Sequence, residues 1–84
     1  MEGIFIRDQS GHKIIYCRNI ILDAFDDRND TYAIIEETGD SEILLGEYSE
    51  EKAEKVMKGI WRNIADNISV YDMPTDMYDL GENK

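Results

Sequence analysis

The sequence predicts an α+β fold in which a curved antiparallel sheet of about five strands is covered by one helix. Short β-rich runs separated by turn residues fill the first half of the chain, and a long amphipathic segment follows them. Apolar residues recur there every three or four positions: Ala53, Val56, Met57, Ile60 and Ile64, with Trp61 and Ile68 widening the stripe. Because one helix in a chain of 84 residues cannot bury its own stripe, a sheet must pack against it.

Four β-rich runs occupy the N-terminal half of the chain. They are residues 3–7 (GIFIR), 13–17 (KIIYC), 20–25 (IILDAF) and 31–37 (TYAIIEE). Turn residues at positions 8–11 predict that the first two runs form a hairpin, and the acidic segment 26–30 separates the third run from the fourth. Since every connection before the helix is short, we expect neighbouring strands to be antiparallel.

The entry to the helix carries the strongest local signals. Residues 42–45 predict a fifth strand, which follows a glycine-containing turn at residues 38–40. Gly46 permits a bend that leads to Ser49, and serine is a favoured helix N-cap. We therefore expect the strand to end at Leu45, before the bend at Gly46, and the helix to begin at Ser49.

The remainder of the chain completes a single domain. Residues 69–73 (SVYDM) predict a sixth, short strand that Pro74 ends, so the α+β domain covers residues 1–74 and a polar tail covers residues 75–84. Gly59 weakens the helix and indicates a close contact with a strand or with a second chain. Several strands are apolar on both faces, so either the sheet curls into a partial barrel or a second subunit covers the face that the helix leaves open.

Charge is the strongest compositional feature of the chain. The net charge is −10, and eleven of the 19 acidic residues but one of the nine basic residues lie between positions 19 and 51. This window therefore accounts for the whole excess of negative charge. Such a surface disfavours direct binding to nucleic acid or to an anionic membrane and favours a basic partner.

Two interpretations of the acidic window stay open. In the first, the acids keep a small protein soluble and protect the sheet edges from unwanted pairing. In the second, they imitate nucleic acid, because carboxylates two residues apart on a strand lie about 6.6 Å apart on one face, comparable to successive phosphates. The residues that we expect to contact a partner are Asp23, Asp26, Asp27, Asp30, Glu36, Asp40, Glu42 and Glu47.

Residues of catalytic or metal-binding type are sparse. The single histidine, His12, lies beside a turn and is expected at the surface, and the single cysteine, Cys17, is expected to be a buried thiol rather than a nucleophile. Residues 26–37 match a calcium loop only in part, because Arg28 and Thr31 stand where a ligand and a glycine are needed. We therefore expect no enzymatic activity, no cofactor and no metal ion.

The chain carries no signal for export or membrane insertion. Residues 1–16 do not resemble a signal peptide, no apolar run approaches the ~18 residues of a membrane span, and one cysteine cannot form an internal disulfide. These observations predict a cytoplasmic protein.

Residues 45–60 (LGEYSEEKAEKVMKGI) and 70–74 (VYDMP) resemble a group of small phage and prophage proteins of Gram-positive bacteria. Those proteins begin with two short strands, carry a leucine-glycine-x-tyrosine strand end before an E-x-A-x-x-V helix, and finish with a strand that ends in methionine-proline. The resemblance covers nearly the whole chain and carries no catalytic residues. The acidic middle and the longer acidic tail after Pro74 depart from the group's pattern.

A phage origin, small size and concentrated acid together resemble the inhibitors that phages direct at host defence systems. The leading hypothesis is a non-enzymatic, anti-CRISPR-like protein that mimics DNA and binds a basic nucleic-acid groove of a bacterial defence nuclease. The alternative is a structural interaction module, a homodimer whose acidity serves solubility alone.

Overall fold

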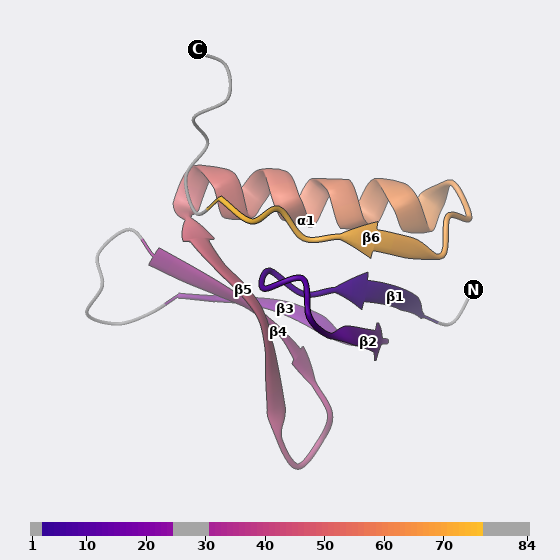
Figure 1. The fold of residues 1–84 in the computed structure, drawn as a ribbon, viewed down its shortest axis with the longest axis horizontal. Helices are drawn as coiled ribbons and strands as arrows, with labels where there is room; N and C mark the ends of the chain where they lie inside the picture. Colours follow the sequence, from indigo (N-terminus) through magenta and orange to yellow (C-terminus); the bar gives the residue numbers. More distant parts are fainter. Residues whose placement is uncertain (1–2, 25–30, 77–84) are drawn as a thin grey trace.

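The computed structural model describes residues 3–24 and 31–76, which form two three-stranded sheets and one helix that packs on both (Figure 1). In chain order the elements are β1 (Ile4–Arg7), β2 (Ile14–Cys17), β3 (Ile20–Ala24), β4 (Thr31–Glu37), β5 (Glu42–Ser49), α1 (Glu50–Ala65) and β6 (Val70–Asp72). The predicted α+β class is confirmed, and each predicted run contains a strand.

The strands form two sheets rather than the one curved sheet that we expected. β2, β1 and β6 form the first sheet, and β3, β4 and β5 form the second. The β1–β2 and β4–β5 hairpins are antiparallel as predicted, but β6 pairs parallel with β1, where Phe5 lies opposite Val70. The helix is the reason for the parallel pair, because it carries the chain back across both sheets before β6 begins.

Specific residues set the two ends of the helix. The Ser49 hydroxyl accepts a hydrogen bond from the backbone N–H of Lys52 at 3.2 Å, so the predicted N-cap is confirmed. After the helix, Asn67 has a φ of 63°, a left-handed conformation that asparagine tolerates. Ile68 therefore lies beyond the helix. Trp61 is 68% exposed, since its position is about 100° around the helix from the buried Ile60.

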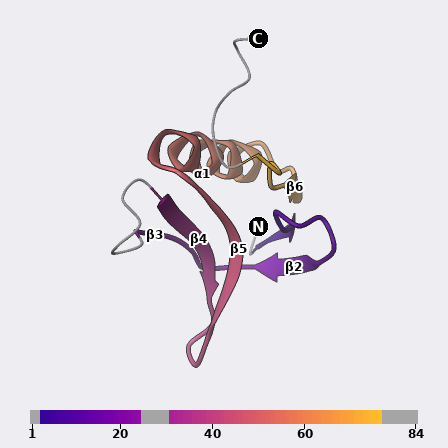
Figure 2. The same cartoon turned by 60° about the vertical axis from the view of Figure 1, so that its left-hand side comes forward.

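β5 continues beyond Leu45, where we expected the strand to end, through Gly46 as far as Ser49. The pairing register shifts between Ile34 and Ile35, and this irregularity lets β5 curve rather than break (Figure 2). A Cβ on Gly46 would lie 2.7 Å from the ring of Tyr48. Gly46 is therefore needed inside the strand, where it leaves room for that ring.

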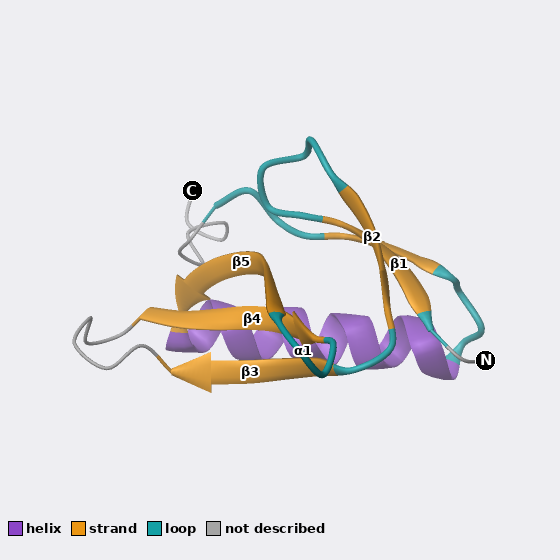
Figure 3. Ribbon diagram, turned by 90° about the horizontal axis from the view of Figure 1, so that it is seen from below, coloured by secondary structure: helices purple, strands orange, loops and turns teal. Residues whose placement is uncertain are grey.

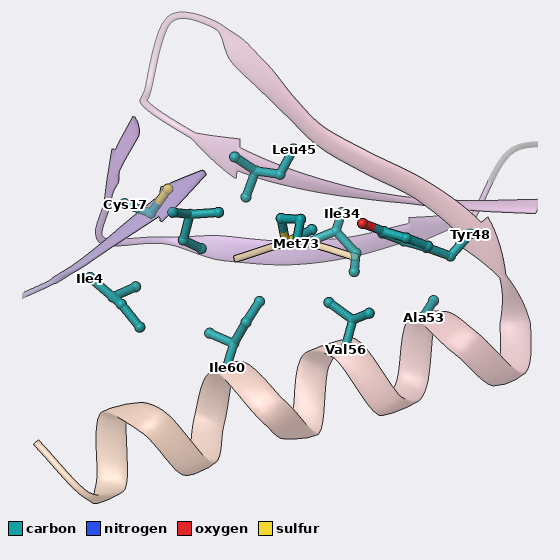
Figure 4. Close-up of a cluster of buried hydrophobic side chains, with 10 residues drawn as sticks. Ile4, Cys17, Ile34, Leu45, Tyr48, Ala53, Val56, Ile60 and Met73 are labelled. Atoms are coloured by element: carbon teal, nitrogen blue, oxygen red, sulfur yellow. The ribbon is translucent and has the colours of Figure 1, made fainter. Parts of the chain in front are cut away.

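The core lies between the helix and the inner faces of both sheets (Figure 4). Its buried members are Ile4, Ile6, Cys17, Ile34, Leu45, Tyr48, Ala53, Val56, Ile60 and Met73. A Cβ on Gly59 would lie 2.9 Å from the hydroxyl of Tyr71 in β6, so the predicted close contact at Gly59 is confirmed and lies within the chain. The Tyr48 hydroxyl donates a hydrogen bond to the backbone carbonyl of Pro74 at 2.7 Å.

Replacing Tyr48 by phenylalanine should lower the free energy of unfolding by about 1 kcal/mol, because the variant leaves the Pro74 carbonyl without this donor. Urea denaturation followed by circular dichroism measures the change. Tyr16→Phe is the matched control, since the Tyr16 ring is 46% exposed and its hydroxyl can bond to water. Equal urea midpoints of unfolding for the Tyr48→Phe and Tyr16→Phe variants would show that the hydrogen bond from Tyr48 does not stabilise the fold.

Candidate functional site

The second sheet carries acidic side chains on the side opposite the helix. Asp23, Ala33 and Glu47 lie opposite one another across β3, β4 and β5, so their side chains share one face. Because side chains alternate along a strand, Glu37 and Glu42 share the same face at its other end. Figure 3 shows the three strands in front of the helix, seen from this side. We call the surface formed by these residues and the apolar row between them the outer face.

An apolar row separates the two acidic ends of the outer face. Ile21, Ile35 and Leu44 lie opposite one another in the register of the three strands. Ile35 is 7% exposed, whereas Leu44 is 47% exposed. Glu37 lies four positions after Ala33 along β4, so their two rows are about 13 Å apart. The outer face therefore combines an apolar centre with carboxylates on two sides.

The β4–β5 turn concentrates the charge further, at the end of the molecule farthest from the helix (Figures 1 and 2). Glu37 and Glu42 are directly opposite each other, and Asp40 lies in the turn between them. All three are exposed, and they surround a shallow polar hollow together with Gly39 and Ser41. Like charges directly opposite each other destabilise a sheet, so this arrangement has a stability cost that a basic partner would offset.

The eight acids that we expected to contact a partner fall into four groups. Asp23, Asp40 and Glu42 are exposed, and Glu47 is half-buried on the outer face. Glu36 is buried at 5% exposure. Asp26, Asp27 and Asp30 lie outside the described residues.

The expectation that Glu36 contacts a partner is wrong, because its carboxylate is used inside the protein. It accepts hydrogen bonds from the backbone N–H of Arg18 at 3.2 and 3.1 Å and from that of Asn19 at 3.1 Å. These two residues connect β2 to β3, so the carboxylate holds the link between the two sheets. A buried carboxylate is tolerated when it is hydrogen-bonded in this way.

Glu37, which was not among the eight acids expected to contact a partner, is exposed on the outer face, whereas its neighbour Glu36 is buried. Ile34 and Ile35 are both apolar, so the sequence does not show which of them faces the helix. The structure places Ile34 in the core, which puts Glu36 on the inner face and Glu37 on the outer face. The sequence does indicate that Glu36 and Glu37 cannot both lie on the outer face, because adjacent side chains on a strand point to opposite sides.

The expected phosphate-like row along one strand is also wrong in its geometry. Asp40 lies in the turn, and β5 begins at Glu42, so the two residues do not have the spacing of a strand. The acidic pairs are instead formed between strands. Glu37 and Glu42 are on neighbouring strands, about 5 Å apart at their Cβ atoms, and Asp23 and Glu47 are two strands apart, about 10 Å.

Two residues of catalytic type have surroundings that agree with the sequence. His12 is exposed beside the β1–β2 turn, and Cys17 is a buried free thiol. Burial, together with the nearby Glu36 carboxylate, raises the pKa of the Cys17 thiol to about 12, so it stays protonated at neutral pH.

Among the described residues, no group of three or more His, Cys, Asp or Glu side chains could hold a metal ion. In the same part of the chain, no helix has the length and apolar character to cross a membrane.

Comparison of the chain with protein-family models, with curated proteins and with solved structures finds no match.

Replacing Glu36 by alanine should lower the free energy of unfolding by about 2 kcal/mol, because two backbone N–H groups then lose a charged acceptor. Glu37→Ala is the matched control, since its exposed side chain makes a single bond at 3.4 Å, to the Asn19 amide. Thermal and urea denaturation of both variants measure the difference. A Glu36 variant as stable as the Glu37 variant would contradict the role of this carboxylate.

The buried Cys17 thiol should also make stability fall at alkaline pH. The thiol of the unfolded chain ionises near pH 9, whereas the folded protein holds it neutral to about pH 12, so the unfolded state releases its proton first. Between these values, the free energy of unfolding should decrease as the pH rises. Urea denaturation at pH 8, 9 and 10 measures the slope, and Cys17→Ala should show a shallower one. Identical slopes would rule out this contribution.

Proposed function

We propose that the chain is a non-enzymatic binding protein whose outer face and β4–β5 turn engage a basic surface on a partner protein. The observation that carries this proposal is the cluster of Glu37, Asp40 and Glu42, in which two carboxylates face each other across a hairpin. Carboxylates in that position weaken the hairpin and attract cations. A partner with lysine or arginine side chains offsets the repulsion and associates faster at low salt.

The partner that we propose is a bacterial defence nuclease with a basic nucleic-acid groove, which makes the protein an anti-CRISPR-like inhibitor acting in the bacterial cytoplasm. The resemblance of residues 45–60 and 70–74 to small phage proteins supports this choice of target. The acidic pairs do not repeat the spacing of successive phosphates along one strand. Binding to the groove therefore depends on local charge and on contact with Leu44 in the apolar row.

The environment of the reactive side chains supports a binding role rather than catalysis. A nucleophilic cysteine needs an ionised thiol, but the Cys17 thiol is buried and its pKa is raised. The buried Glu36 carboxylate is occupied by backbone N–H groups, and His12 is exposed at a turn. None of these three residues belongs to the acidic cluster.

The proposal is tested with a triple charge reversal, Glu37→Lys, Asp40→Lys and Glu42→Lys. The tagged protein is used to retain purified nucleases from a panel of bacterial RNA-guided enzymes, with and without competing duplex DNA and raised salt. We expect the native protein to retain a nuclease that DNA or salt displaces, and we expect the triple variant to lose at least tenfold in affinity.

The matched control reverses three exposed acids elsewhere: Glu54→Lys, Asp66→Lys and Asp76→Lys. This control changes the net charge by the same amount, so an effect of total charge alone would appear in both triple variants. Retention of no nuclease by the native protein would overturn the choice of target. Equal binding by the two triple variants would overturn the assignment of the acidic cluster as the contact site.

A further inference from the structure

The first sheet exposes a second surface, which differs from the outer face in both polarity and charge. On the side away from the core, β2, β1 and β6 present six side chains: Phe5, Arg7, Ile14, Tyr16, Val70 and Asp72. We call this surface the N-terminal face. Its four apolar side chains are exposed by 46% (Phe5), 70% (Ile14), 46% (Tyr16) and 58% (Val70). Contiguous exposure of this kind on a small domain is typical of an interaction site.

Two aromatic rings of the N-terminal face are already held in place. The ring centroids of Phe5 and Tyr16 are 4.8 Å apart, with the ring planes inclined at 52°. A Cβ on Gly3 would lie 2.7 Å from the Tyr16 ring, so that ring packs directly over the Gly3 backbone. Aromatic side chains that are ordered before binding lose little conformational entropy on binding and often dominate the affinity of an interface.

The shape of the face suits an identical surface. Phe5, Ile14 and Val70 contribute to the lining of a hollow of about 200 Å³. Ile14, the most exposed of the apolar side chains on this face, borders that hollow. A two-fold interface brings the same patch of both copies together, so Ile14 of each copy can pack against the hollow of the other.

The charges of the face also favour a second copy. Arg7 donates hydrogen bonds to Asp72 from Nε at 3.2 Å and from a terminal guanidinium nitrogen at 3.3 Å. This pair leaves the N-terminal face without net charge, although the chain as a whole carries −10. A second copy is repelled from the acidic outer face, whereas here it meets an apolar and neutral surface.

We propose that a second copy of this chain binds the N-terminal face, in a two-fold symmetric dimer. In this dimer Arg7 of each copy pairs with Asp72 of the other. The pair is suited to such an exchange, since the two side chains are 52% and 70% exposed in the single chain. Because the face is only about 10 Å wide between its outer strands, the dimer forms reversibly and depends on concentration.

The test uses two charge reversals, Arg7→Glu and Asp72→Lys, in sedimentation equilibrium from about 5 to about 500 μM. The average mass of the native protein should rise from 9.7 kDa towards twice that value. Each variant alone should stay monomeric, because it brings like charges together at the interface. An equimolar mixture of the two should dimerise again, since the copy with two acids complements the copy with two bases.

Lys58→Glu is the matched control, because it reverses an exposed positive charge on the helix and should dimerise like the native protein. Circular dichroism confirms that each variant is folded. A native protein that stays monomeric throughout the range would overturn the proposal, and so would a mixture of folded variants that stays monomeric.

This inference is independent of the proposed function, because the two surfaces belong to different sheets. Charge reversal on the β4–β5 turn should leave the monomer–dimer equilibrium in place, and the Arg7 variant should still bind a basic partner through its outer face. Failure of one proposal is therefore distinguishable from failure of the other.

Discussion

The buried carboxylate of Glu36 determines how the chain passes from one sheet to the other. It accepts hydrogen bonds from the consecutive N–H groups of Arg18 and Asn19, so the short link between β2 and β3 turns inward towards β4. The carboxylate depends on the two N–H groups, because a buried carboxylate without hydrogen-bond partners would be costly. This link is the point at which the chain leaves the first sheet and enters the second, and each sheet has an exposed face of its own.

Local patterns predicted the elements well, because their causes are local. The apolar spacing of three and four placed the helix, Ser49 capped it, and the glycine-containing turn at residues 38–40 produced the β4–β5 hairpin. The pairing of β6 with β1 was not predictable in this way. Phe5 and Val70 are far apart in the sequence, and neither carries a signal for its partner strand.

The candidate site was predicted in composition but not in arrangement. The concentration of acidic residues between positions 19 and 51 is visible in the sequence. The side of the sheet on which each carboxylate of β4 lies is not, because it depends on which of two adjacent isoleucines enters the core. Ile34 does so, and Glu36 is consequently buried. The pairing register of β4 and β5 also shifts next to Ile34. A strict alternation of side chains along β5 therefore does not predict which of them face outwards.

Because the two proposed surfaces belong to different sheets, binding of a basic partner and self-association, which the sequence analysis treated as alternatives, are compatible with each other. The acidic cluster belongs to the second sheet and the neutral N-terminal face to the first, so a partner bound to one need not cover the other. A dimer built on the N-terminal face would carry two outer faces. Two such faces on one particle raise the apparent affinity for any partner that can contact both.

The parallel pairing of β1 with β6 also constrains the order of events during synthesis. β1 and β2 leave the ribosome before the helix, but their sheet lacks a strand until residues 70–72 have followed it. Phe5 and Val70 therefore come together only after the whole helix has been synthesised. A nascent chain that still lacks β6 also lacks Val70 and Asp72, so it could not form the proposed dimer through this surface.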